Sequence, residues 1–318
     1  MSNKEQYRHF CRKQKDIPLF SQAWHLDAVI VDGWWDVALV KKGGQIAGSL
    51  PYYLKKSGPF QTISLPYLTK MMGPYLLPQY RHSKHEYSIL KALIDQLPEV
   101  AFFSQNMHYD LKNWLPFYWK GYQQSTYYSF VIDPLDDLDR VFGNFCSDYR
   151  NNKIKKAKNL VEIQTDRSLD DFYRLKKMSF ERQGLNFRLS FDYLQRYDAL
   201  VAQRGARTIF YAVDAKDQVH AAVYLVWDGR SAYYHMAGHD PNLRGSGAGI
   251  LLVWEAIRYT KEKLGLQVFD FEGSMIPSIE KVRRNFGAQA QAYFNIWKYH
   301  SKTFQALQQV KNWVKSRD

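Results

Sequence analysis

The sequence predicts an α/β protein with mixed sheets. Two observations lead to this prediction. Strand-like and helix-like patterns alternate along both halves of the chain. The 318 residues, of which 46% are hydrophobic, are enough for a real core and fit one large domain or two of ordinary size. We expect one domain over residues 1–148 and the other over residues 149–318.

The composition indicates a soluble, cytoplasmic protein without a membrane span. Aromatic residues make up 16% of the chain, which is not a disordered composition. The longest apolar runs, such as Ala221–Trp227 and Ala248–Trp254, are too short to cross a bilayer, and the N-terminal sequence has no apolar signal core. Cys11 and Cys146 are the only cysteines and lack metal-ligand spacing, so we expect reduced thiols and no metal.

The net charge is +13 and the pI is about 9.4. A surface of this kind attracts nucleic acid, anionic lipid or a small ligand rich in phosphate, or it serves only solubility. Charge alone does not choose among these partners.

The first half reads as a helical start followed by a hairpin and further mixed elements. The hairpin turns at Lys41–Gly44. The elements expected after the first helix are strands Trp35–Val40 and Gln45–Leu54, an irregular segment from Pro59 to Pro78, a helix over His82–Leu97, and strands Val100–Ser104 and Thr126–Ile132.

A basic run, Tyr149–Lys158 (YRNNKIKKAK), opens the second half. Five of its ten residues are Lys or Arg, and Ile154 and Ala157 lie three apart. This spacing predicts one amphipathic helix with a basic face. That face is either solvated or binds phosphates, those of tRNA or of a phosphate-bearing acceptor.

The rest of the second half reads as two helices, a meander of three strands, a turn-rich loop, a long helix, a strand, a helix and a strand. The expected helices are Leu169–Glu181, Phe191–Gln203, Gly249–Leu264 and Pro277–Asn285, and the expected strands are Thr208–Val213, Val219–Trp227, Ser231–Ala237, Leu266–Phe271 and Gln289–Lys298.

A glycine-rich loop, Arg244-Gly245-Ser246-Gly247-Ala248-Gly249, lies between the third meander strand and the long helix. Glycines let the backbone approach a ligand, and the helix start offers free N–H groups and partial positive charge. The dinucleotide fingerprint would need a glycine at Ile250, and the Walker pattern would need Lys-Ser/Thr after the last glycine. The loop is therefore a candidate pyrophosphate site, or else an ordinary loop-to-helix turn.

The spacing Arg244-x-x-Gly247-x-Gly249 resembles the coenzyme A signature of the GNAT superfamily. The segments Tyr149–Leu160 (YRNNKIKKAKNL), Phe269–Ser274 (FDFEGS) and Val282–Gly287 (VRRNFG) resemble the FemABX family, most closely its small GNAT or BioF-like relatives. In the first half, Leu50–Tyr53 and Pro66–Thr69 resemble it more weakly. The resemblance covers nearly the whole chain and implies two tandem GNAT-like domains.

The resemblance also implies transfer of an acyl group to an amine, with the catalytic site in or beside the second domain. FemABX enzymes use aminoacyl-tRNA as donor and a peptidoglycan precursor as acceptor, whereas their GNAT relatives use acyl-CoA. Because the glycine signature is kept, we expect acyl-CoA, acetyl-CoA or longer, as the donor co-substrate. The acceptor is a small-molecule or cell-wall-precursor amine; tRNA is the less favoured partner.

Glu272 and His235 are the candidate bases. Glu272 follows the strand Leu266–Phe271 at the end where α/β folds place ligands, and His235 lies in the strand before the glycine-rich loop. Glu272 could instead be an ordinary strand-end residue. Asp270, two residues earlier, reads as a buried structural carboxylate.

Three arginines and a glutamine complete the candidate site. GNAT enzymes often carry Tyr four residues before the glycine that corresponds to Gly287, but Arg283 stands there. An arginine cannot act as a general acid at neutral pH, although it can stabilise an oxyanion or hold a phosphate. Arg284, Arg182 and Gln183 are candidate acceptor-binding residues, or solvated surface groups.

The sequence therefore predicts an acyl-CoA-dependent N-acyltransferase. Two alternatives stay open: an aminoacyl-tRNA-dependent transferase of the FemABX type, supported by the charge and the basic run, and a non-catalytic binding protein with a GNAT fold, supported by the missing tyrosine.

Overall fold

The computed structural model describes residues 1–81 and 84–315. The chain forms two compact units: unit 1 contains Met1–Tyr127 and the segment from Ala292 onward, and unit 2 contains Tyr128–Gln291. The chain passes from one unit to the other within strands β6 (Gln123–Ile132) and β12 (Gln289–Tyr299). This division differs from the boundary predicted at 148/149. The sequence pattern of a strand does not reveal that the chain crosses from one unit to the other within it. The limits of the two GNAT-like domains stay a prediction.

The sheet of unit 1 is mixed. Its order is β1-β2-β3-β5-β12, and only the β3–β5 pair is parallel among the adjacent pairs of this path. The predicted hairpin is β1 paired antiparallel with β2. The strands are β1 (Trp34–Lys42), β2 (Gln45–Ser57), β3 (Phe60–Ser64), β4 (Tyr75–Leu76, paired with β2) and β5 (Phe102–Asn106). The segment predicted to be irregular, from Pro59 to Pro78, thus contains two short strands.

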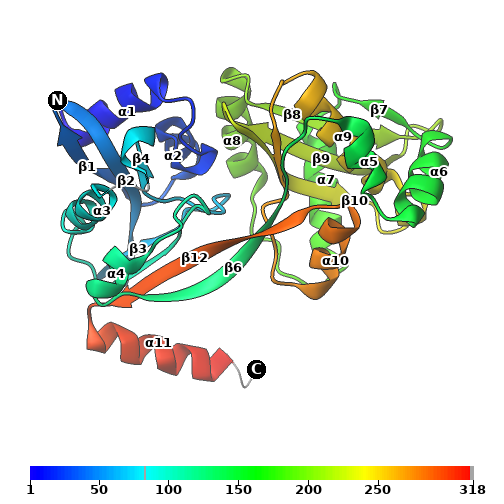
Figure 1. The fold of residues 1–318 in the computed structure, drawn as a ribbon. Coiled ribbons are helices and arrows are strands. Elements are labelled where there is room, and N and C mark those ends of the chain that lie inside the picture. The colour runs from blue at the N-terminus through cyan, green and yellow to red at the C-terminus, as the bar shows by residue number, and fades with distance from the viewer. Residues whose placement is uncertain (82–83, 316–318) are drawn as a thin grey trace. The chain divides into compact units, whose positions relative to one another are not determined.

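Helices cover the sheet of unit 1 (Figure 1). Leu90 and Leu93 of α3 pack in one cluster with Leu50 and Ile63 of the sheet. The predicted helix over His82–Leu97 is observed as α3; residues 82–83 lie outside the described residues. The helices are α1 (Asn3–Lys13), α2 (Ala23–Val29), α3 (Glu86–Ile94), α4 (Leu115–Trp119) and α11 (Lys302–Lys315), with short 3₁₀ turns at Leu19–Ser21 and Pro78–Tyr80.

The sheet of unit 2 has the order β6-β11-β10-β9-β8-β7. The β10–β11 pair is parallel and its neighbours are antiparallel. This is the predicted meander followed by a crossover through a long helix. The strands are β7 (Glu162–Gln164), β8 (Arg207–Val213), β9 (Val219–Trp227), β10 (Ser231–His239) and β11 (Val268–Asp270).

Side chains alternate along these strands, so helices pack on both faces of the sheet. Val223 and Leu225 of β9 share a core cluster with Leu252 of α9, whereas Tyr224 between them packs its ring against Phe172 of α7. The helices are α5 (Leu138–Gly143), α6 (Ile154–Lys158), α7 (Leu169–Glu181), α8 (Phe191–Gln203), α9 (Ala248–Glu262) and α10 (Pro277–Asn285), with a π-helical turn at Tyr149–Lys153 (Figure 1).

Serine caps set the start of two predicted helices. Ser168 accepts a hydrogen bond from the Asp171 N–H at the start of α7, and Ser190 accepts one from the Tyr193 N–H at the start of α8. The predicted bounds of α7, α8 and α10 are those observed. The predicted α/β class with mixed sheets is confirmed. None of the helices described here is long and apolar enough to cross a membrane.

Candidate functional site

The glycine-rich loop connects the end of β10 to the start of α9 in unit 2 (Figure 1). Arg244–Ser246 form one 3₁₀ turn, and Gly247 follows with φ of 80°, a left-handed conformation that favours glycine. The buried Ser246 accepts a hydrogen bond from the Ala248 N–H at 3.2 Å and so caps the helix start. Arg244 and Gly245 are exposed at the tip of the loop.

The three glycines of the loop have different reasons to be glycine. A Cβ on Gly247 would lie 2.6 Å from the Lys153 carbonyl oxygen, and a Cβ on Gly249 would lie 2.3 Å from Cε1 of His239. Both positions are therefore required by the protein's own packing. A Cβ on Gly245 would meet nothing within 4 Å. The sequence analysis attributed all three glycines to ligand approach, but only Gly245 leaves open space.

The basic run lies beside this loop. Its apolar residues Ile154 and Ala157 are buried in the same core cluster as α9, and the Lys156 Nζ donates a hydrogen bond to the Gly245 carbonyl at 2.8 Å. The prediction of one continuous amphipathic helix is wrong in detail, because Tyr149–Lys153 form a π-helical turn before α6 begins. The run nevertheless brings positive charge to the glycine-rich loop.

Strands β10 and β11 diverge in the middle of unit 2. Among the described residues their pairing covers Ser231–Tyr233 against Val268–Asp270, although β10 continues to His239. The pairing of β10 with β9 shifts register between Tyr234 and Met236, so His235 is an extra residue in a bulge. The divergence and the bulge together separate the strands beside His235.

His235 and Glu272 form a hydrogen-bonded pair across this divergence. The His235 Nδ1–H donates to Glu272 Oε1 at 2.7 Å, and the side chains are 2% and 13% exposed. Glu272 has φ of 58°, which is uncommon outside glycine, and its N–H donates to Asp270 Oδ1. Asp270 is fully buried and also accepts from the Ser129 hydroxyl, which agrees with the structural role predicted for it. A strained backbone held by a buried carboxylate thus aims Glu272 at His235.

Lys176 of α7 lies close enough to Glu272 for their charges to interact. Burial lowers the pKa of Lys176 to about 8, while the Glu272 carboxylate opposes that shift. The two groups are held near each other because α7 packs tightly on β10. A Cβ on Gly238 would lie 2.5 Å from the Lys176 backbone nitrogen, and the Ser179 hydroxyl accepts a hydrogen bond from the His239 N–H.

His239 marks a concentration of positive charge between β10 and the glycine-rich loop. Burial, together with the charges of Arg244, Arg182, Lys176 and Arg283, lowers its pKa to about 4. These cations come from segments far apart in the chain: α7 and the turn after it, the glycine-rich loop, and α10. Their convergence favours an anionic ligand at this place.

Arg283 and Arg284 are neighbours on α10 with different surroundings. The Arg283 guanidinium lies 4.6 Å from the ring centre of Tyr234 and 4.9 Å from that of Phe271, so it stacks on both rings. Tyr234 is the residue that precedes His235. Arg284 instead pairs with Glu280, with its side chain 66% exposed. Arg283 therefore packs on the residues that precede His235 and Glu272 in the chain, whereas Arg284 is turned toward solvent.

Arg182 and Gln183 lie in the exposed turn after α7. The Gln183 amide donates to the Ser179 carbonyl at 2.8 Å. Arg182 contributes to the positive charge around His239, so it is the one of the two that is associated with the candidate site.

The sequence analysis missed Lys176, Lys156 and His239. Lys176 carries no motif, and its importance comes from the close packing of α7 on β10. Lys156 was seen only as part of a basic run. A signal for two of them was available in the glycines. Gly238 allows the backbone of Lys176 to approach β10, and Gly249 allows the ring of His239 to approach the start of α9.

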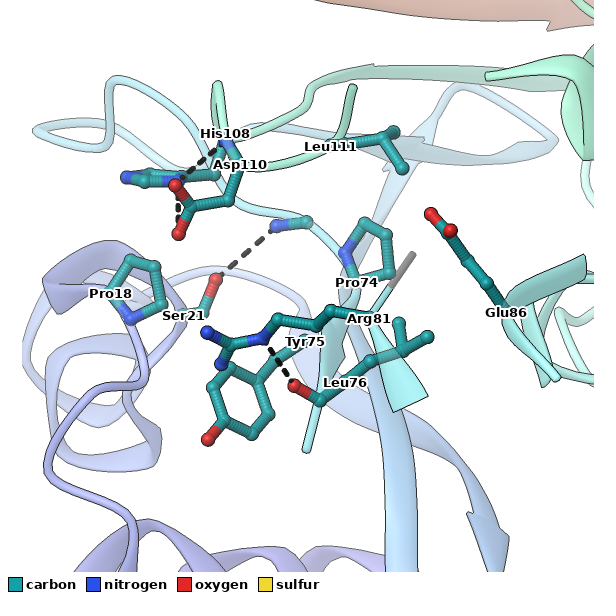
Figure 2. A pocket seen from close by; sticks show the side chains of 11 residues that line it. Pro18, Ser21, Pro74, Tyr75, Leu76, Arg81, Glu86, His108, Asp110 and Leu111 are labelled. Carbon is teal, nitrogen blue, oxygen red and sulfur yellow. Dashed lines mark hydrogen bonds and ion pairs between the residues drawn. The ribbon is translucent and has the colours of Figure 1, made fainter. Parts of the chain in front are cut away.

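Unit 1 contains a small cavity of about 40 Å³, shown in Figure 2. Its polar groups are engaged with one another: the Asp110 N–H donates to the buried His108 Nδ1, the Gly73 N–H donates to Ser21 Oγ, and Arg81 donates to the Leu76 carbonyl. This volume holds a few water molecules, not an acyl donor.

Comparisons with known proteins agree with this geometry. Residues 147–277 match the family model described as an acetyltransferase (GNAT) domain. Three solved structures match most of the chain. FemX is 12% identical with a TM-score of 0.71, and the match covers 92% of this chain and 95% of FemX. L-PGS from Bacillus licheniformis is 12% identical with a TM-score of 0.57 (coverage 97% and 96%), and a tandem GNAT protein from the clavulanic acid biosynthesis pathway is 13% identical with a TM-score of 0.52 (coverage 93% and 94%). No curated protein matches the sequence.

These structural likenesses, at 12–13% identity, establish the fold of tandem GNAT proteins over nearly the whole chain. The family model covers the glycine-rich loop, strands β10 and β11, and the His235–Glu272 pair. The predicted resemblance to the GNAT superfamily is thus confirmed for residues 147–277, and FemX and the tandem GNAT protein share the fold of nearly the whole chain.

Proposed function

We propose that unit 2 transfers an acyl group from acyl-CoA to an amine. The observation that carries this proposal is the spacing of two features along β10: the glycine-rich loop at its end and the His235–Glu272 pair at the divergence from β11. His235 and His239 are four residues apart, about 13 Å at the rise of an extended strand. An extended pantetheine arm separates the pyrophosphate of acyl-CoA from its thioester by a comparable span.

The same spacing disfavours aminoacyl-tRNA at this site. In aminoacyl-tRNA the reactive ester lies on the terminal ribose, one sugar away from the nearest phosphate. A phosphate held by the glycine-rich loop would then leave the ester well short of Glu272. In acyl-CoA, by contrast, the phosphates and the acyl carbonyl can occupy both places at once.

The phosphates of the donor would be bound by backbone N–H groups of the loop and by Arg244, with Lys156 close by. Lys156 donates to the Gly245 carbonyl, so its charge is fixed at the loop tip rather than free in solvent. The start of α9 adds partial positive charge in the same direction.

In the reaction the acceptor amine attacks the acyl carbonyl, its proton moves to a base, and the CoA thiolate leaves. Glu272 is the proposed base because its carboxylate is the more exposed member of the pair and already accepts from His235. His235 is then a positioning residue. Arg283, fixed by its stacking on Tyr234 and Phe271, offsets the negative charge that develops on the oxygen or the thiolate.

The experiment that tests the donor site compares two arginines at opposite ends of α9. Arg244→Ala removes a charge-assisted hydrogen bond to phosphate worth about 1.5–3 kcal/mol, so the affinity for acetyl-CoA falls roughly ten- to a hundredfold. Arg258→Ala is the matched control, since Arg258 pairs with Glu255 and Glu262 on the same helix. Calorimetry that gives both variants the wild-type affinity, with both still folded, rejects the loop as the donor site.

A second candidate is the aminoacyl-tRNA-dependent reaction that the FemABX resemblance implies. The observation in its favour is that Lys155 and Lys158 are exposed on the basic run beside the loop. Binding of RNA through this run would weaken steeply with salt, with a slope of about −0.7 per phosphate neutralised on a single strand. The same assay with tRNA therefore separates the two donors.

A further inference from the structure

The C-terminal helix α11 of unit 1 has an apolar side with no function in the account above. Figure 1 shows α11 in red after β12. Its first turn is anchored, because Phe304 is 4% exposed and its ring lies 5.2 Å from that of Phe60. Beyond that turn, Leu307, Val310 and Val314 recur at i, i+3 and i+7 and so share one side of the helix.

This side is exposed. Leu307 is 55%, Val310 61% and Val314 48% exposed, and Trp313 beside them is 55% exposed. Scattered exposed apolar residues are normal, but Leu307, Val310 and Val314 lie within eight residues on one side of the helix and form a continuous strip. The strip requires a partner or a solvent less polar than water.

The charge of α11 indicates which partner. The helix carries lysines at positions 302, 311 and 315 and has no acidic residue. Lys311 follows Val310 and borders the strip, so the helix offers apolar side chains with cations beside them. A two-fold contact with a second copy would bring Lys302 and Lys311 of the two copies toward one another without an opposing charge.

We propose that α11 binds an anionic lipid surface, with its axis in the plane of the headgroups and Leu307, Val310 and Val314 directed toward the acyl chains. The 14-residue helix is about 21 Å long at 1.5 Å per residue, too short to span a hydrocarbon core of about 30 Å. An amphipathic helix with a cationic border is the kind that lies in the interface. The inference is independent of the acyl donor used by unit 2.

The test is co-sedimentation of the whole chain with vesicles at about 0.1 M salt, where surface charges still act over about 10 Å. Vesicles of equal parts phosphatidylcholine and phosphatidylglycerol should bind the protein, and vesicles of phosphatidylcholine alone should bind it at least tenfold less. Each lysine near the surface contributes about fivefold to binding, so Lys311→Glu should lower binding by at least that factor. Lys91→Glu, an exposed lysine on α3, is the charge-matched control and should have no comparable effect.

Two valines of similar exposure, Val310 at 61% and Val31 at 58%, separate the apolar contribution of the helix from general hydrophobicity. Val310→Ser together with Leu307→Ser should abolish vesicle binding, whereas Val31→Ser, at a residue 58% exposed outside the helix, should leave it unchanged. Unaltered melting temperatures confirm the fold of each variant. No binding to anionic vesicles, equal binding to both kinds, or a concentration-dependent dimer that the Leu307→Ser/Val310→Ser variant abolishes would overturn the proposal.

Discussion

The two units are built from similar parts but use their polar side chains differently. In unit 1, the polar groups around the small cavity bind one another and the backbone, as Arg81 does with Asp16 and Leu76. In unit 2, His235 and Glu272 meet where β10 leaves β11, and cations from distant segments surround His239. The difference teaches that polar side chains of unit 2 converge where its sheet opens, whereas those around the cavity of unit 1 bind one another and the backbone.

Arg81 and Arg283 show the same difference at a single residue type. Both guanidinium groups lie over aromatic rings, Arg81 over Tyr75 and Arg283 over Tyr234 and Phe271. The Arg81 guanidinium also pairs with Asp16, which neutralises it. Arg283 lies among further cations near His239, so its charge is available to an anion.

The largest expected effect is on turnover when a carboxylate of unit 2 is neutralised. Glu272→Gln keeps the shape of the side chain but removes the base, so kcat should fall roughly 100- to 10,000-fold. Acetyl-CoA affinity should change little, because the phosphates are bound elsewhere. Thiol release from acetyl-CoA with a panel of amines measures the first quantity and calorimetry the second.

Asp110→Asn provides the corresponding change in unit 1. Asp110 lines the small cavity of that unit, and its neutralisation should leave turnover unchanged. Equal losses in the two variants would mean that the division of roles between the units is wrong.

Two alanine substitutions in the glycine-rich loop test the packing argument at an intermediate size of effect. Gly249→Ala places a Cβ against the His239 ring and should lower the free energy of unfolding by about 1–3 kcal/mol, as overpacking does. Gly245→Ala points into open space and should stay within about 0.5 kcal/mol of wild type. Chemical denaturation measures both. A Gly249→Ala protein as stable as Gly245→Ala would show that His239 does not pack on the loop.

An effect of similar size, spread over two to three pH units, concerns the pH dependence of stability. The folded pKa of His239, about 4, lies below its usual 6.5, so between these pH values the unfolded chain binds a proton that the folded chain does not. This group therefore makes the free energy of unfolding fall as the pH falls from about 6.5 to about 4, by up to about 3 kcal/mol at 1.36 kcal/mol per pKa unit. His239→Gln should flatten that part of the stability curve. A curve identical to wild type would mean that His239 titrates as an ordinary surface histidine.

Much of the fold follows from the sequence because local signals agree with the final structure. Ser168 and Ser190 mark the starts of α7 and α8, and the glycine-rich loop marks the start of α9. The boundary between the units could not be predicted. The residue pattern of a strand does not tell which strands it pairs with or that the chain changes unit within it. The C-terminal helix was missed although Leu307, Val310 and Val314 have helical spacing.

The candidate site was predictable where it lies in contiguous motifs and not where packing creates it. Glu272, His235 and Arg283 were identified from their places relative to strands and to the FemABX-like segments. The structure joins Glu272 to His235 and places Arg283 on Tyr234, the residue before His235. The link between them depends on the bulge at His235 and on the left-handed backbone of Glu272, which no local pattern encodes. Lys176 reaches the site through the approach of α7 at Gly238, a contact between distant segments.

The central claim is that the glycine-rich loop of unit 2 binds acyl-CoA rather than the end of a tRNA. The most direct measurement is the stability of the native protein in the presence of acetyl-CoA or of aminoacyl-tRNA. The account predicts that acetyl-CoA at a hundredfold excess over its dissociation constant raises the free energy of unfolding by about 2.7 kcal/mol, and that the combined variant Arg244→Ala/Lys156→Ala loses this gain. Stabilisation by aminoacyl-tRNA with none by acetyl-CoA would contradict it.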